Sequence, residues 1–204
     1  AVIEKKDYGR FGEIMYVQNK FELDSLYKDY PEFKKRLGSK GKERRLTSSI
    51  FTLIPEIFKD YKSETNNIGI YGRQNNERVY KYVDIKYLEK HTNLYKWKVI
   101  VPAANGSGEF GEILSSPIVG KPGIGHTQTF ISIGAFDTEF ESYACLKYIK
   151  TKFTRAMLGV LKVTQNNKTK ETWSKIPIQD FTPNSDIDWT KSIAEIDQQL
   201  YKKY

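Results

Sequence analysis

"HTQTFISIGAFDTEFESYACLKYIKTKF", residues 126–153, decides the fold class because a strand pattern runs directly into the start of a helix. The run HTQTFISIGAF is rich in Thr, Phe and Ile, the composition of a β-strand. Thr138 and Glu141 then have the spacing of a capping box, in which a threonine and a glutamate three residues apart begin a helix. The stretch therefore predicts a strand followed by a helix.

The rest of the chain mixes both patterns without a regular β-α-β order. Further strands are predicted in residues 66–83, where two runs flank the turn QNN to form a β-hairpin, in 95–102 and in 173–181. Helices are predicted in residues 20–45, broken near Pro31 and followed by a basic loop around Gly38–Gly41, in a short turn capped by Asp84, and in 188–204. We expect an α+β fold: a mixed, largely antiparallel sheet packed with several helices.

Composition favours a folded cytoplasmic protein. The 204 residues are 39% hydrophobic, and no apolar run approaches the roughly 18 residues of a membrane span, so we expect no membrane partner. The opening AVIEKKDYGRFGE lacks the apolar core of a secretory signal. Cys145 is the single cysteine, which fits a reducing compartment and favours core packing over a nucleophilic role. The 33 Lys and Arg against 25 Asp and Glu give a charge of +8, which suits a phosphate backbone.

The positive charge is concentrated in "YIKTKFTRAMLGVLKVTQNNK", residues 148–168. A helix of about twenty residues there would put Ile149, Phe153, Ala156 and Val160 on one face and Lys147, Lys152, Arg155 and Lys162 on the other. A solvated helix face and a nucleic-acid surface are both compatible with this pattern. Because no acid occurs from Lys147 to Lys170, phosphate contact is favoured. The amides of Gln165, Asn166 and Asn167 suit base edges or phosphates, and equally suit a turn.

Two other segments are candidates for binding or catalysis. The loop PAANGSGEFGEILSS, residues 102–116, offers Asn105 and Ser107 among glycines, but it lacks the Lys-Ser/Thr pair of a nucleotide-binding loop. A surface loop and a DNA-contacting loop both fit it. Asp84 and Lys86 form half of a magnesium-nuclease motif, and a helix start with a solvated lysine is the preferred interpretation. No metal site is expected, because the two histidines lack nearby Cys or carboxylate partners.

Residues 95–181, from YKWKVIVP to IPIQDF, and the final DIDWTKSIAEIDQQLYKKY resemble a known family. They are similar to the C-terminal, TaqI-like specificity region of bacterial type II restriction-modification adenine-specific DNA methyltransferases. The resemblance covers roughly residues 68–204. It implies a target-recognition-domain-like fold and divides the chain into an N-terminal helical connector or annex, 1–67, and a DNA target recognition domain, 68–204.

The same resemblance implies the function. In that family a separate catalytic domain binds S-adenosylmethionine through a glycine-containing loop and methylates adenine with an Asn-Pro-Pro-aromatic motif, neither of which occurs in this chain. We therefore expect no cofactor and no catalysis here, with duplex DNA and the methyltransferase domain of the same parent chain as partners. Some members of the family also carry a nuclease domain, of which this sequence shows no remnant. The expected DNA contacts are Arg73, Asn105, Ser107, Lys121, His126, Lys152, Arg155, Lys162, Gln165 and Asn166. The alternatives are a magnesium-dependent restriction nuclease fragment using Asp84 and Lys86, and a protein interaction domain of a restriction complex.

Overall fold

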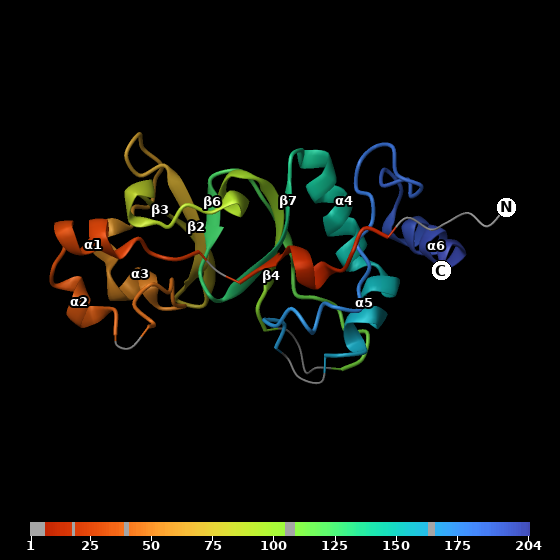
Figure 1. The fold of residues 1–204 in the computed structure, drawn as a ribbon, viewed down its shortest axis with the longest axis horizontal. Coiled ribbons are helices and arrows are strands. Elements are labelled where there is room, and N and C mark those ends of the chain that lie inside the picture. The colour runs from red at the N-terminus through yellow and green to blue at the C-terminus, as the bar shows by residue number, and fades with distance from the viewer. Residues whose placement is uncertain (1–6, 18, 39–40, 105–108, 163–165) are drawn as a thin grey trace.

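The computed structural model describes residues 7–17, 19–38, 41–104, 109–162 and 166–204. They form an elongated α+β fold of two lobes, each built on its own sheet (Figure 1). The chain begins in the second lobe, crosses to build most of the first, and returns (Figure 1). The α+β class predicted from the sequence is confirmed.

The first lobe packs short helices against a three-stranded mixed sheet of order β3-β2-β6. Its hydrophobic cluster is formed by residues between Phe21 and Leu94. The predicted helix break near Pro31 is confirmed, since one helix ends at Asp29 and the next begins at Phe33. The elements are α1 (Leu23–Asp29), α2 (Phe33–Arg36), α3 (Ile50–Leu53), η2 (Pro55–Ile57), β2 (Ile68–Gln74), β3 (Glu77–Val83), η3 (Ile85–Tyr87), η4 (Thr92–Tyr95) and β6 (Ile124–His126).

The second lobe packs the three longest helices near a four-stranded antiparallel sheet of order β1-β7-β4-β5. Its core includes the fully buried Trp173 and Tyr148, and Cys145 is 0% exposed within it, which confirms the predicted core packing of that thiol. The elements are η1 (Phe11–Ile14), β1 (Met15–Tyr16), β4 (Trp97–Pro102), β5 (Ile118–Gly120), β7 (Phe130–Phe136), α4 (Glu139–Lys150), α5 (Lys152–Gly159) and α6 (Ile193–Lys203).

Local sequence signals account for several of these elements. The capping box of Thr138 and Glu141 begins α4, as predicted: the Thr138 hydroxyl accepts from the Glu141 N–H, and the Glu141 carboxylate accepts from the Thr138 N–H. Asn75 and Asn76, with φ of 50° and 64°, form the tight turn of the predicted β2–β3 hairpin. Asp84 caps η3 by accepting from the Lys86 N–H.

Three predicted elements differ in the structure. The strand expected over residues 126–136 is divided into the end of β6 and the whole of β7, which belong to different sheets. The helix of about twenty residues is interrupted at Thr151, whose hydroxyl accepts from the Thr154 N–H and begins α5 as a new helix. Val160, predicted on the apolar face, follows α5 and is 54% exposed. Residues 173–181, predicted as a strand, form turns and irregular backbone. Their β-pairing among the described residues is limited to the isolated antiparallel bridge between Arg10 and Pro177.

The lobes are joined by β6, which pairs parallel with β2 through Gly69–Ile124, Ile70–Gly125 and Tyr71–His126. A small cluster of Tyr71, Ile100 and Phe130 fills the space between the sheets. The predicted boundary between residues 67 and 68 falls inside the cluster that runs from Phe21 to Leu94. The division into connector and recognition domain stays a prediction.

Buried polar groups sit at this junction. The His126 imidazole is 2% exposed, with Nδ1 3.0 Å from the Thr127 carbonyl and Nε2 3.1 Å from the Ser132 hydroxyl. Burial lowers the pKa of His126 to about 4. The ammonium of Lys98 donates to the carbonyls of Leu94 and Ile124, and burial lowers the pKa of Lys98 to about 7. No helix among the described residues has the length and apolar character to cross a membrane.

The low pKa of His126 makes part of the stability depend on pH. Between pH 6.5 and about 4 the unfolded chain binds a proton at this imidazole that the folded chain does not, so acidification destabilises the fold. We expect His126→Gln to be less stable than the wild type at pH 7, because its buried hydrogen bonds are altered. The difference in free energy of unfolding between the wild type and His126→Gln should then become smaller below pH 6.5, by at most about 1.4 kcal/mol per pH unit.

Urea unfolding of both proteins at pH 7, 6, 5 and 4.5 measures this gap. The other titrating groups, including His91, are present in both proteins and cancel in the difference. A gap that stays constant over this range would show that His126 does not bind its proton differently in the two states.

Candidate nucleic-acid interface

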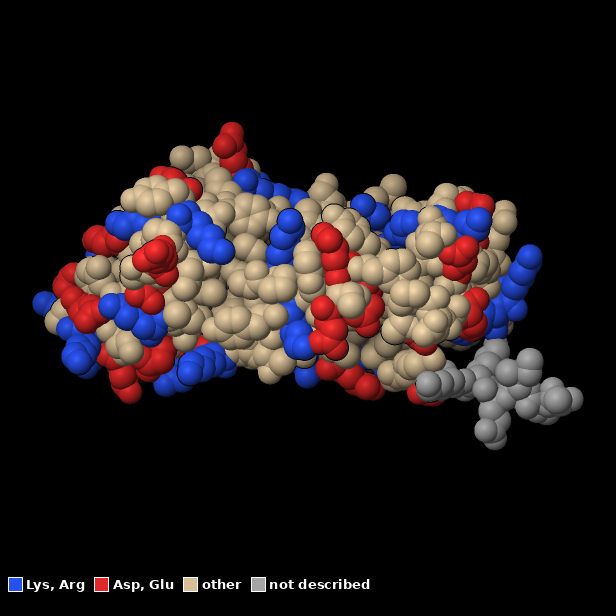
Figure 2. Space-filling model, turned by 90° about the horizontal axis from the view of Figure 1, so that it is seen from above, with Lys and Arg blue, Asp and Glu red and all other residues tan. Residues whose placement is uncertain are grey.

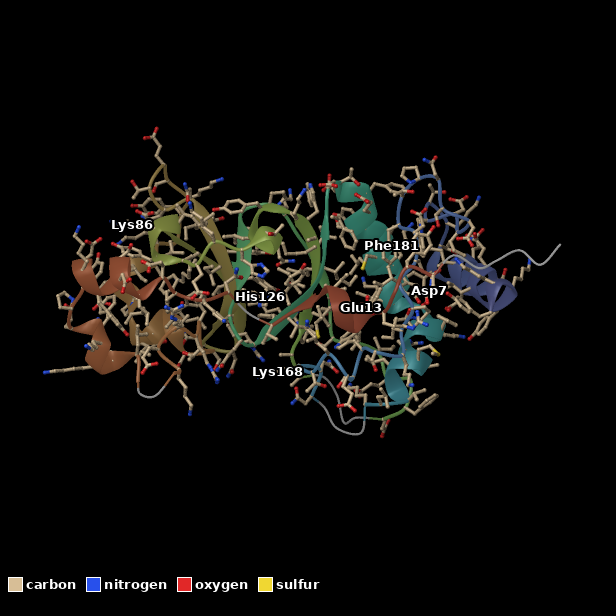
Figure 3. All side chains as sticks on the ribbon, viewed as in Figure 1. Asp7, Glu13, Lys86, His126, Lys168 and Phe181 are labelled. Carbon is tan, nitrogen blue, oxygen red and sulfur yellow. The ribbon has the colours of Figure 1, made fainter. Side chains whose placement is uncertain are left out.

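Three adjoining hollows of about 260, 400 and 390 Å³ lie between the lobes, and together we call them the central groove. The first shares Gln128 and Lys168 with the second and shares Ser48, Arg73 and Thr129 with the third. Lys168 marks its place along the lower edge of the molecule (Figure 3). The remaining described lining residues are Val17, Lys20, Gly41, Arg44, Arg45, Ser49, Thr52, Gln74, Asn75, Asn76, Arg78, Pro102, Ala103, Ala104, Ser115 and Phe130.

All charged residues in the described lining of the groove are Lys or Arg, and most of these line the first two hollows. No Asp or Glu occurs in it, although the chain holds 25 acids against 33 bases. The view from above in Figure 2 shows a different surface, on which Lys and Arg alternate with Asp and Glu. The groove is therefore a local concentration of positive charge. Its cations are Lys20, Arg44, Arg45, Arg73, Arg78 and Lys168.

Backbone pairing fixes the segments that carry these cations. The Phe21 N–H donates to the Arg44 carbonyl, and the Gln128 N–H donates to the Leu46 carbonyl, which hold the segment around Arg44 and Arg45 at the groove. On the other wall, the Asn167 N–H donates to the Ala103 carbonyl over 2.8 Å. The indole of Trp173 donates to the Asn167 carbonyl, also over 2.8 Å, which anchors the residue preceding Lys168 in the core.

The cations differ in how far they are already engaged. Arg44 pairs with Glu89, and Arg78 donates to the carbonyls of Ser115 and Ser116. Lys20, Arg45 and Lys168 form no salt bridge or side-chain hydrogen bond within the described ranges 7–17, 19–38, 41–104, 109–162 and 166–204. These three side chains are the ones best able to bind an incoming anion.

Arg73 and Arg78 face one another across the β2–β3 hairpin, as paired residues in the register. Like charges directly opposite on neighbouring strands destabilise a sheet. Both line the same hollow, and no carboxylate among the described lining residues lies between them. A bound phosphate would relieve this repulsion, and the arginine fork matches its oxygens.

The sequence-predicted contacts are only partly gathered at the groove. Arg73 lines it, and Asn166 borders it through a β-bridge to the lining residue Ala104. Lys121 lies in the turn between β5 and β6, beside η4, and lines none of the three hollows. Lys152 and Arg155 lie on α5, where the Lys152 N–H donates to Asp197. Asn105, Ser107 and Gln165 lie outside the described residues.

Two predicted contacts need correction because their side chains are buried. His126 is 2% exposed inside the junction between the lobes, so its imidazole is inaccessible to DNA in this conformation. Lys162 is 4% exposed and its ammonium pairs with Glu112, and burial lowers the pKa of Lys162. The supposed basic stripe is further reduced because Lys147 donates to the carbonyls of Trp189, Thr190 and Lys191.

Over the described part of the chain, no three His, Cys, Asp or Glu side chains are grouped as metal ligands would be. Lys86 pairs with Asp29 over 2.8 Å and lies 3.9 Å from Asp84, and the Asp84 carboxylate caps a helical turn.

Sequence reasoning missed five of the groove's cations: Lys20, Arg44, Arg45, Arg78 and Lys168. Arg44 and Arg45 lie in the basic stretch SKGKERR and Lys168 in the run without acids from Lys147 to Lys170, whereas Lys20 and Arg78 have no comparable signal. A pattern within one segment cannot show that separate segments converge.

The burial of Lys162 predicts a structural role for it. Lys162→Met would leave the Glu112 carboxylate, 13% exposed, without this counter-charge, and we expect a loss of about 1–3 kcal/mol in the free energy of unfolding. Lys152→Met, at the exposed start of α5, is the matched control and should change stability by less than about 0.5 kcal/mol. Urea denaturation compares them, and equal stability of the two variants would contradict the structural role.

Comparisons with known proteins add no relative to this picture: no family model, no curated protein and no solved structure matches the chain.

Proposed function

We propose that this chain binds double-stranded DNA through the central groove, as the target recognition domain of an adenine-specific DNA methyltransferase of a type II restriction-modification system. The observation that carries the proposal is the run of six cations along three adjoining hollows with no carboxylate among the described lining residues. A single small anion needs two or three such groups. Six cations spread over adjoining hollows suit a polyanion, whose phosphates are neutralised one by one.

The family resemblance specifies the kind of DNA-binding protein. Its support is the similarity of residues 95–181 and 186–204 to TaqI-like specificity regions, together with an α+β fold that offers one basic face between two lobes. In this proposal the protein acts in the cytoplasm, and the catalytic domain of the same parent chain modifies the base. The module positions that domain on its target sequence.

The charge of the groove lining favours a polyanion over S-adenosylmethionine, whose net charge is positive. The cofactor carries a sulfonium cation, which the cationic lining would repel, and no carboxylate among the described lining residues is present to bind its ribose hydroxyls. We therefore assign the methyl donor to the separate catalytic domain. The fragment itself is proposed to be non-catalytic.

The salt dependence of binding tests the groove. Lys20→Ala, Arg45→Ala and Lys168→Ala together remove the three groove cations that form neither a salt bridge nor a side-chain hydrogen bond among the described residues. Each phosphate contact contributes about 0.9 to the slope of log K against log salt, so we expect the slope to become shallower by about 2–3. Fluorescence anisotropy with a labelled duplex of about 25 base pairs, from 50 to 200 mM salt, measures it.

The matched control removes the same charge elsewhere: Lys150→Ala, Lys152→Ala and Lys202→Ala, all exposed and outside the groove lining. Its slope should stay near that of the wild type. A larger loss in the control would place the interface on the basic helix predicted from the sequence. A flat salt dependence in the wild type would favour a protein partner over DNA.

A further inference from the structure

The tip of the β2–β3 hairpin has a chemistry different from that of the rest of the groove. Gln74, Asn75 and Asn76 place three neutral amides next to one another, and Glu77 adds a carboxylate directly opposite Gln74. A carboxylate repels phosphate, whereas it accepts a hydrogen bond from the amino group of cytosine. Asn and Gln amides pair in two-point fashion with adenine. The tip therefore suits base edges better than a DNA backbone.

Resting on the proposed DNA-binding function, we propose that the amides of Gln74, Asn75 and Asn76 read base edges in the major groove, while the cations of the central groove hold the phosphates. All three amide residues line the third hollow, which joins the cationic hollows through Ser48, Arg73 and Thr129. A protein bound along the groove would thus bring this tip against the duplex.

The shape of the hairpin fits such a role. A two-stranded β-ribbon is narrow enough to enter the major groove of B-form DNA. Here the strands are paired without interruption from Ile68–Val83 to Gln74–Glu77, and the turn contains only Asn75 and Asn76. Both turn residues are exposed, so their amides point to solvent and not into the fold.

The tip is also held rigidly, which a base-reading element requires. The guanidinium of Arg73 donates to the Asn76 carbonyl over 2.9 Å and so braces the turn from one strand. Behind it, residues 68–72 of β2 are buried. Gly72 lies so close to α3 that a Cβ there would approach the Phe51 ring to 2.5 Å, so the strand rests directly on the helix.

Asparagine is also a common turn residue, because it tolerates the positive φ found at both positions. The two roles can be separated. Glycine adopts positive φ without strain, so Asn75→Gly with Asn76→Gly keeps the turn and removes both amides. Gln74→Ala removes the third amide from a regular strand position. Asn184→Gly and Gln198→Ala are the matched controls at exposed positions in the second lobe.

The experiment selects duplexes from a random pool at low salt with the wild-type chain, then measures Kd for the selected duplex and for a scrambled one. We expect Asn75→Gly/Asn76→Gly and Gln74→Ala to reduce the ratio of the two Kd values by about 10-fold or more, since a two-point base contact contributes about 1–3 kcal/mol. Their affinity for the scrambled duplex and their salt slope should change less than twofold. The control variants Asn184→Gly and Gln198→Ala should keep the wild-type ratio of Kd values and the wild-type salt slope.

Each of the other outcomes would contradict one part of the proposal. An unchanged ratio in the hairpin variants, or a wild type that binds every duplex equally, would overturn base reading by the tip and leave the phosphate-binding groove in place. A wild type that binds no duplex at low salt would overturn the DNA-binding function itself. Reduced affinity for both duplexes together would mean that the tip contacts the backbone.

Discussion

The parallel pairing of β6 with β2 is the constraint on which the rest of the structure depends. Strand β6 belongs to the first sheet, yet its neighbours in the chain, β5 and β7, both belong to the second. Residues 121–123 and 127–129 connect β6 to these two strands, so the two sheets are linked here by only a few residues on each side. Gly125 lets the side chain of Asn19 approach β6, because a Cβ there would lie 2.5 Å from the Asn19 amide oxygen, which accepts from the His126 N–H.

This connection also makes the groove. The short link from β6 to β7 lines the groove with Gln128 and Thr129. The Gln128 N–H donates to the Leu46 carbonyl of the first lobe. Short links that are bonded to both lobes leave little freedom for the lobes to move apart. The cations on the two walls therefore keep a fixed spacing, which is what a regular row of phosphates would require.

Elements encoded by neighbouring residues could be predicted from the sequence. The capping box at Thr138, the Asn75–Asn76 hairpin and the helix break at Pro31 depend on side chains within a few positions of the feature. The break at Thr151 could not be predicted in this way. Asp197, on α6, accepts from the N–H groups of Lys152 and Phe153, so a residue far along the chain stabilises the start of α5.

The same limit applies to the site. Arg73 could be proposed from its hairpin. Lys162 was predicted as a contact from its place on the basic face of an expected helix and His126 from an expected loop, and both are buried. Whether a lysine binds DNA or stabilises the fold depends on its neighbours in space. Lys98, Lys147 and Lys162 are engaged by carbonyls or by Glu112, so much of the charge between residues 97 and 162 serves the fold. The net charge of +8 therefore says less about binding than the location of the unengaged cations.

Arg78 connects the two parts of the proposed interface. It lies on β3 just beyond the hairpin tip, and its guanidinium reaches the carbonyls of Ser115 and Ser116 in the chain segment that precedes β5 of the other lobe. Its opposite face lies 5.7 Å from the Phe130 ring, at the start of β7. The hairpin is thus tied to the second lobe at the same level as the groove. In a DNA complex, these hydrogen bonds of Arg78 would set the distance between the phosphates bound in the groove and the bases that face the hairpin tip. The hairpin could not shift relative to the second lobe without breaking them. Sequence reading by the amides would then depend on Arg78 even though Arg78 need not contact a base.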